Sequence, residues 1–163
     1  MINQNPEEKK RFLDMYWDTI KKEKDLYIFK YMWYNCIIQR FAGHLNWYVA
    51  IPCHSNLYNK NYYEFIEENI DEIQKAINNI EVHWWLTFWW EYKSISIEWY
   101  DFSFCFWFDT AHLWDAFYDR MSWRVKMWSF WEEWEYRDYN YVLSEVKRLV
   151  EQIDKIDRDF ILK

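Results

Sequence analysis

Three residues that could carry out acid–base chemistry recur at steps of three in the sequence: Asp109, His112 and Asp115. Side chains three residues apart share a face in a turn or a single helical coil, so the two carboxylates and the imidazole can converge. An aspartate can orient an imidazole, and the imidazole can then take up and release a proton near neutral pH. The spacing therefore predicts a site at which a carboxylate and a histidine divide the acid–base roles.

His83 extends this set, because it also lies at a junction, directly before a strand-like run. His83, Asp109, His112 and Asp115 supply nitrogen and oxygen ligands of the kind that zinc or another divalent metal ion takes. The same four residues are therefore expected to be either catalytic groups or metal ligands with positions open for water. A third interpretation has no chemistry: Asp109 caps a turn, and His112 pairs with Asp115.

The other reactive residue types give weaker signals. We interpret His44 and His54 as surface loop residues, and Cys105, on a strand among aromatic residues, as a small buried apolar side chain. Arg137 could bind an anionic ligand. We favour the simpler interpretation, in which Asp138 caps the following helix and Arg137 forms an ion pair on the surface.

The elements that must position these residues are indicated by apolar spacing. A capping asparagine, a proline at the first helical position and an apolar residue every four positions predict an amphipathic, peripheral helix from Pro6 to about Lys24. Two β-rich runs, Tyr34–Arg40 and Leu45–Ile51, predict an antiparallel hairpin. An isoleucine stripe predicts a helix over Tyr62–Asn78.

The second half of the chain alternates less regularly. Strand-like runs lie at Leu86–Phe88, Tyr92–Ile97 and Phe102–Phe108. The stretch from Thr110 to about Glu135 has no clear periodicity and is expected to be a long, lid-like loop. An apolar stripe then predicts a closing helix over Tyr139–Ile156.

These elements predict the α+β fold class: a single domain with a mostly antiparallel sheet, helices packed on one side and an extra N-terminal helix. We expect residues 1–30 to form an accessory amphipathic helix and residues 31–163 to form the single α+β domain.

Composition narrows the classes of function. The chain has 163 residues and a formal net charge of −7, which argues against non-specific nucleic-acid binding. No apolar run is long enough to span a membrane, and the first ten residues lack the apolar core of a signal peptide. The 3 cysteines form no CxxC motif and favour a reducing compartment. We expect a cytoplasmic protein of unknown oligomeric state.

Glycine and tryptophan occur in unusual numbers, with 1 glycine and 14 tryptophans. The doublets Trp84-Trp85 and Trp89-Trp90 flank a short apolar run, where glycine pairs would be ordinary turn residues. UGA codons are translated as glycine in a few bacterial lineages and as tryptophan in other codes. We therefore hypothesise that most tryptophans stand where the native protein has UGA-encoded glycine; the alternative is a genuinely tryptophan-rich protein.

With these tryptophans taken as glycine, the chain resembles a family of small uncharacterised proteins found mainly in bacteriophages. The resemblance covers about residues 33–153 and rests on Gly43–Pro52, Leu57-Tyr58, Val82–Thr87, Trp107–Asp115, Tyr136-Arg137-Asp138 and Tyr141-Val142. Two departures are Ser55-Asn56, where the family has His-Pro, and Thr110, where it often has cysteine. The resemblance implies a viral origin and little about mechanism.

Two functions are therefore expected as alternatives. The first is a phage accessory protein with a His/Asp site that handles a small ligand or hydrolyses it, with or without a divalent metal. The second is a non-catalytic viral protein that binds a host protein or a small signalling ligand. Convergence of His83 and His112 would favour the first, and clustered exposed aromatic residues would favour the second.

Overall fold

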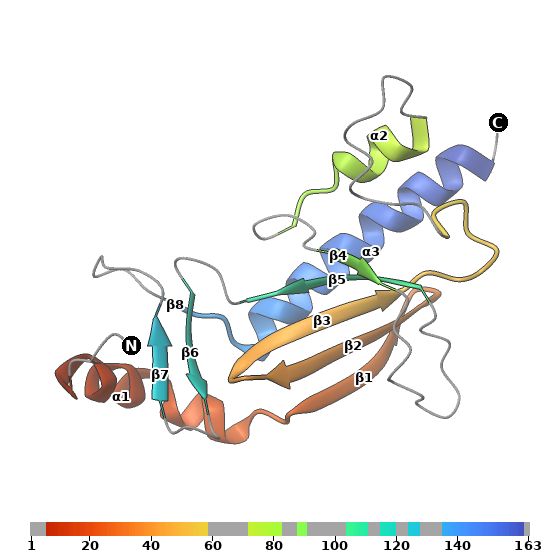
Figure 1. Ribbon diagram of the computed structural model, residues 1–163. Coiled ribbons are helices and arrows are strands. Elements are labelled where there is room, and N and C mark those ends of the chain that lie inside the picture. The colour runs from red at the N-terminus through yellow and green to blue at the C-terminus, as the bar shows by residue number, and fades with distance from the viewer. Residues whose placement is uncertain are drawn as a thin grey trace.

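The computed structural model describes residues 6–58, 72–82, 88–90, 104–110, 115–119, 124–127 and 135–161 (Figure 1). Its first element is helix α1, Pro6–Lys22. The predicted start at Pro6 is confirmed, and the helix ends two residues earlier than predicted. Its spacing of apolar residues buries one face completely at Phe12 and almost completely at Ile20.

Three consecutive strands form an antiparallel meander: β1, Leu26–Tyr31; β2, Tyr34–Phe41; and β3, His44–Ala50. The predicted hairpin is the β2–β3 pair, and its position is confirmed. Strand β1 was not predicted from the sequence. It extends across residue 30, the boundary expected between the N-terminal helix and the rest of the chain.

Two further strands complete the main sheet among the described residues. Strand β5, Cys105–Asp109, pairs with β3, and β4, Phe88–Trp90, pairs with the other side of β5. The strand order is β1-β2-β3-β5-β4, and every pair is antiparallel. The strand predicted at 92–97 lies outside the described residues. The strand predicted at 102–108 corresponds to β5.

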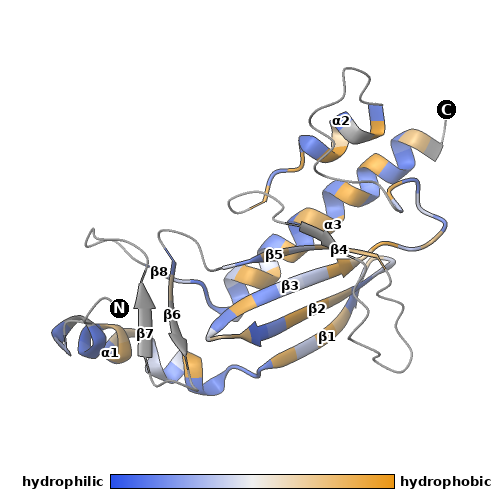
Figure 2. Ribbon diagram, in the orientation of Figure 1, coloured by the Kyte–Doolittle hydropathy of each residue, from blue (hydrophilic) through white to orange (hydrophobic). Residues whose placement is uncertain are grey.

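The main core lies between one face of this sheet and helix α3, Tyr139–Ile161. The predicted stripe is confirmed, because Val142, Val146, Leu149 and Ile153 are completely buried. They pack in one cluster with strand residues that include Trp47 and Phe108. Figure 2 shows apolar and polar residues alternating along α3, as expected of a helix with one buried face.

Helix α2, Glu72–Asn78, packs on α3 and is the described part of the helix predicted over residues 62–78. Residues 62–71 lie outside the described residues. Helix α2 lies beside the C-terminal half of α3, at the far end of the molecule from α1 (Figure 1).

A second, three-stranded sheet lies between α1 and the main sheet, where the sequence predicted a long loop (Figure 1). It contains β6, Asp115–Asp119; β7, Arg124–Met127; and β8, Glu135–Tyr136. The loop prediction over 110–135 is therefore wrong. The strands are short, and charged residues interrupt their apolar alternation, so the stretch has no clear period.

The α+β fold class is confirmed: the sheet is antiparallel, and helices at the two ends of the chain pack against the strands. Phe12 and Ile20 of α1 form a small core of their own with Ala116 and Tyr136. Within the described residues, no helix is both long and apolar enough to cross a membrane.

Candidate functional site

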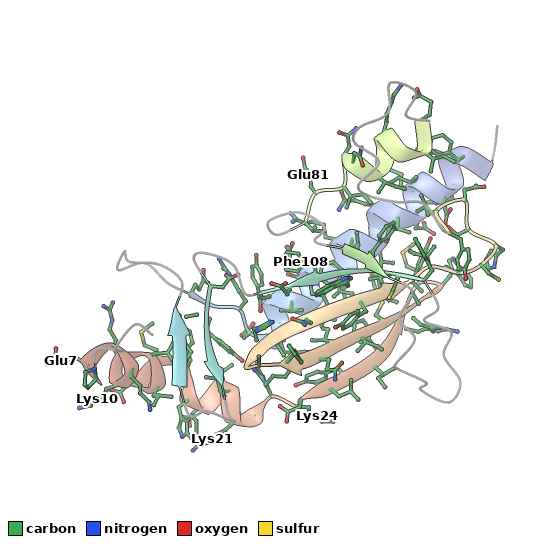
Figure 3. The ribbon with its side chains drawn as sticks, in the orientation of Figure 1. Glu7, Lys10, Lys21, Lys24, Glu81 and Phe108 are labelled. Carbon is green, nitrogen blue, oxygen red and sulfur yellow. The ribbon has the colours of Figure 1, made fainter. Side chains whose placement is uncertain are left out.

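The first predicted site residue, Asp109, is the last residue of β5, and the chain after it is fixed by Thr110. The backbone N–H of Leu45 donates to Thr110 Oγ1 at 3.3 Å, and the Thr110 hydroxyl donates to the carbonyl of Leu45 at 3.1 Å. A side chain thus takes the place of a backbone partner where the β3–β5 ladder ends. Thr110 is only 3% exposed, so water does not compete with these bonds. Figure 3 labels Phe108, the residue before Asp109.

The second predicted carboxylate, Asp115, begins β6 and is completely buried. Its Oδ1 accepts a hydrogen bond from Nε of Arg137 at 3.0 Å. The parallel pairing of β6 with β8 explains this contact, because it places Asp115 opposite Glu135, two residues before Arg137. The guanidinium also donates to Glu135 at 2.5 Å, and it therefore compensates the charges of both carboxylates.

Arg137 is held on a further side by an aromatic ring. Its guanidinium carbon lies 4.6 Å from the ring centroid of Tyr141, one turn into α3. Burial acts to lower the pKa of Arg137, but its hydrogen bond to Asp115 and the charge of Glu135 outweigh burial and raise it. Arg137 is therefore a permanent cation whose donors are directed at protein carboxylates.

These contacts decide between the two interpretations of the Arg137 segment. Asp138 caps α3, because its Oδ1 accepts a hydrogen bond from the backbone N–H of Tyr141 at 2.8 Å. The capping prediction is confirmed. Arg137 forms the predicted ion pair with an exposed carboxylate, that of Glu135 at 2.5 Å, and it forms a second ion pair with the buried Asp115 at 3.0 Å. The proposed pairing of Asp115 with His112 is untested, because His112 lies outside the described residues.

His83 and His112 both lie outside the described residues, so their convergence stays a prediction. What the structure shows is the placement of Asp109 and Asp115 at the two ends of the segment that carries His112. No group of three or more His, Cys, Asp or Glu residues within the described ranges could hold a metal ion. The metal role of His83, Asp109, His112 and Asp115 therefore also stays a prediction.

One neighbour of Asp109 escaped the sequence analysis. Asn46 lies directly opposite Asp109 in the β3–β5 register and is 6% exposed. A buried asparagine is unusual, because its amide must find hydrogen-bond partners when it leaves water. The available signal was a polar residue inside the otherwise apolar run from Leu45 to Ile51.

Predictions for the remaining reactive residues can be compared with their burial. His54 is exposed, as expected, whereas His44 is half-buried at the start of β3. Cys105 is completely buried, and burial raises its pKa from 9.0 to about 12, so its interpretation as a small apolar residue is confirmed.

A different buried cluster, centred on Glu23, joins three parts of the chain. None of the residues named in this cluster was predicted as a site residue. Arg40 donates to Glu23 at 2.5 Å and to the Tyr136 hydroxyl at 3.0 Å, and that hydroxyl donates to Glu23. The backbone N–H of Tyr139 donates to the second oxygen of Glu23 at 2.7 Å. Both oxygens of Glu23 are therefore used inside the protein, which indicates a structural role.

No family model matches the chain, and neither a curated protein nor a solved structure matches it significantly. The function must therefore be argued from the arrangement of Asp109, Thr110, Asp115 and Arg137.

Proposed function

We propose that this protein is a bacteriophage-type accessory protein that acts on a small ligand in the cytoplasm of a bacterial host cell. The ligand-handling groups are Asp109 and His112. Asp109 orients the imidazole, and His112 transfers a proton between the ligand and water, as in acid–base hydrolysis.

The observation that carries this proposal is that Thr110 and Asp115, which precede and follow residues 111–114, are both held by contacts with the rest of the fold. Thr110 anchors the start through two hydrogen bonds to the backbone of Leu45. Asp115 anchors the end through its buried ion pair with Arg137. A catalytic segment needs rigid supports, because small displacements of the reacting groups cost large factors in rate.

Arg137 favours the acid–base role over the metal role. Its guanidinium lies within hydrogen-bond distance of Asp115, one of the four predicted ligands. A fixed cation beside a carboxylate opposes the binding of a second, divalent cation to it. We therefore assign Asp115 and Arg137 positioning roles, and we place the proton transfer at Asp109 and His112.

The test compares purified wild-type protein with His112→Ala and Asp109→Asn in thermal-shift and hydrolysis assays against a metabolite panel. We expect at least one ligand to raise the melting temperature of the wild type, and we expect its turnover to fall about 100-fold or more in both variants. His54→Ala is the matched control, because His54 is an exposed histidine, and it should behave as the wild type. Equal turnover in all four proteins would overturn the proposal.

The metal role is tested in parallel by measuring bound zinc, manganese and iron in the same preparations. The acid–base proposal expects no stoichiometric metal and turnover that chelators do not change. A bound metal that His83→Ala and His112→Ala both release would replace it with the metal site. Ligand binding without turnover would instead support the non-catalytic alternative, a viral protein that binds a host protein or a small signalling ligand.

We also propose that the native chain contains glycine at most of the tryptophan positions. The turns of the meander support this. Gly43 is the second residue of the β2–β3 turn, and the exposed Trp33 occupies the same place in the β1–β2 turn, although without the positive φ of Gly43. The completely buried Trp47 does not share this support. Mass spectrometry of peptides from the native protein tests the proposal. Tryptophan at Trp84, Trp85 and Trp107 would contradict it.

A further inference from the structure

The side chain of Asn46 carries a buried acceptor, Oδ1, for which the described residues supply no donor. Asn46 is 6% exposed, and its Oδ1 is buried without a hydrogen-bond partner among the described residues. Leaving a buried carbonyl without a donor costs about 1–3 kcal/mol. A leucine of similar volume at this position would have no unpaired acceptor and would avoid this loss of stability. The presence of an asparagine therefore indicates a functional role.

The strand register places Asn46 beside the predicted site. Asn46 and Asp109 are direct partners in the antiparallel β3–β5 pair, so their side chains share a face, with Cβ atoms about 4.5–5.5 Å apart. This is the face opposite α3, because the alternating neighbours Leu45, Trp47 and Phe108 belong to the core under that helix. The β3–β5 ladder ends one residue further on, at Thr110.

The chemistry of the pair limits what it can bind. An amide carbonyl and a carboxylate are both acceptors, so the complementary group carries several N–H donors. A planar guanidinium can donate to both oxygens of a carboxylate and to a neighbouring carbonyl. A calcium ion would need about 6–8 oxygen ligands, many more than this pair supplies. The net charge of −7 also attracts a cation.

We propose that Asn46 and Asp109 recognise a guanidinium-type cation on the ligand of this protein, with Asn46 Oδ1 accepting from its N–H. The inference rests on the proposed function, because it assigns the ligand class of the site that contains Asp109.

The chain provides a matched control in Asn35. Its Oδ1 is also buried without a partner in the described part of the chain. Asn35 lies near the start of β2, where it pairs with Lys30 next to the β1–β2 turn. Asn46 lies near the start of β3, where it pairs with Asp109. Asn35 therefore shares the unsatisfied acceptor but lacks the carboxylate partner.

The experiment titrates the full chain with methylguanidinium and monitors the NMR chemical shifts of the Asn46 side-chain amide. Tetramethylammonium is the control ligand, because it is a cation without N–H donors. We expect saturable shifts with methylguanidinium alone. Asn46→Leu should weaken binding about tenfold or more and raise the melting temperature, because it removes both the acceptor and its burial cost. Asn35→Leu should also raise the melting temperature but bind as the wild type.

Asn46→Ala provides a second test if the leucine does not fit, and it should also bind about tenfold more weakly. Equal binding of the two cations, or unchanged binding in both Asn46 variants, would overturn the inference. His112→Ala separates it from the proposed function: methylguanidinium binding should survive this substitution, whereas turnover should not. If a metabolite without a guanidinium group is turned over, and this turnover depends on Asp109 and His112, the guanidinium inference is wrong while the proposed acid–base function stands.

Discussion

At the scale of single residues, the Asp115–Arg137 pair shows how a carboxylate can be buried completely. Asp115 is 0% exposed, and the guanidinium of Arg137 compensates its charge. A buried ion pair adds little over a well-packed apolar pair, but removal of one partner leaves a charge in a medium of low dielectric.

Arg137→Met should therefore lower the free energy of unfolding by about 3 kcal/mol, because the buried Asp115 would lose its ion pair with Arg137. The double variant Asp115→Leu/Arg137→Met should recover most of this loss. Urea denaturation of the wild type, both single variants and the double variant gives the coupling. A double variant whose loss equals the sum of the single losses would contradict the pairing.

The three cysteines should differ in reactivity. Cys36 and Cys105 are completely buried, and burial raises the pKa of each thiol to about 12, whereas Cys53 is exposed. We expect a disulfide reagent to modify Cys53 alone in the native protein near pH 8, and all three thiols in urea. Rapid reaction of more than one thiol in the native state would show that the strands around Cys36 or Cys105 open readily.

Tyr34 should make stability depend on alkaline pH. Burial, and then the charge of Asp157, raise its pKa above the ordinary value of 10.0. Above about pH 10 the unfolded chain loses the phenol proton while the folded chain keeps it, so the free energy of unfolding falls as pH rises. Tyr34→Phe should show a smaller fall between pH 9 and 11, measured by urea denaturation. An unchanged slope would contradict the prediction.

At the scale of elements, the two turns of the meander can be compared directly. Both connect their strands through two residues, Met32-Trp33 in one and Ala42-Gly43 in the other. The first residue of each has a positive φ, 52° at Met32 and 49° at Ala42, and glycine follows only in the second turn. Because Trp33 is 79% exposed, its ring contributes little to the core.

Trp33 has no positive φ, so Trp33→Gly should change the free energy of unfolding by less than about 1 kcal/mol, because an exposed ring is lost and no backbone strain is relieved. Thermal unfolding measures the change. Phe108→Ala is the control, because Phe108 is completely buried in the main core and should lose about 3 kcal/mol or more when truncated. A loss of more than about 1 kcal/mol in Trp33→Gly would show that the exposed ring of Trp33 stabilises this turn.

Elements with strong periodicity were predicted well from the sequence, and irregular ones were not. The stripe from Val142 to Ile153 defined α3, and Pro6 defined the start of α1. Strand β1 was missed because the charged Lys30 interrupts its apolar run. The site was predicted only as spacing, since the contact of Asp115 with Arg137 depends on the parallel β6–β8 pairing, which no local pattern reveals.

At the scale of the whole molecule, the cluster around Glu23 connects the end of α1 with β2, β8 and the start of α3. Its members Arg40, Tyr136 and Tyr139 come from three separate segments. Burial acts to lower the pKa of Arg40, but Tyr136 and Glu23 outweigh it and keep the guanidinium charged.

Arg40→Met should lower the free energy of unfolding by about 3–5 kcal/mol, because Glu23 would keep a buried charge. The loss should also increase amide hydrogen exchange in both α1 and the first turn of α3, since both depend on Glu23. Lys75→Met is the control, because Lys75 pairs with Glu72 within α2 with both side chains exposed and should change stability by less than about 1 kcal/mol. Exchange that increases in α1 alone would show that the cluster does not connect the two helices.

The strand order β1-β2-β3-β5-β4 has a consequence for synthesis on the ribosome. The meander emerges first, but β3 lacks its second neighbour until residues 105–109 have been translated. Until then an apolar strand presents an open edge to other nascent chains. Chaperone demand during production should therefore be greatest between completion of the meander and the arrival of β5, and ribosome profiling with a bound chaperone would locate that interval.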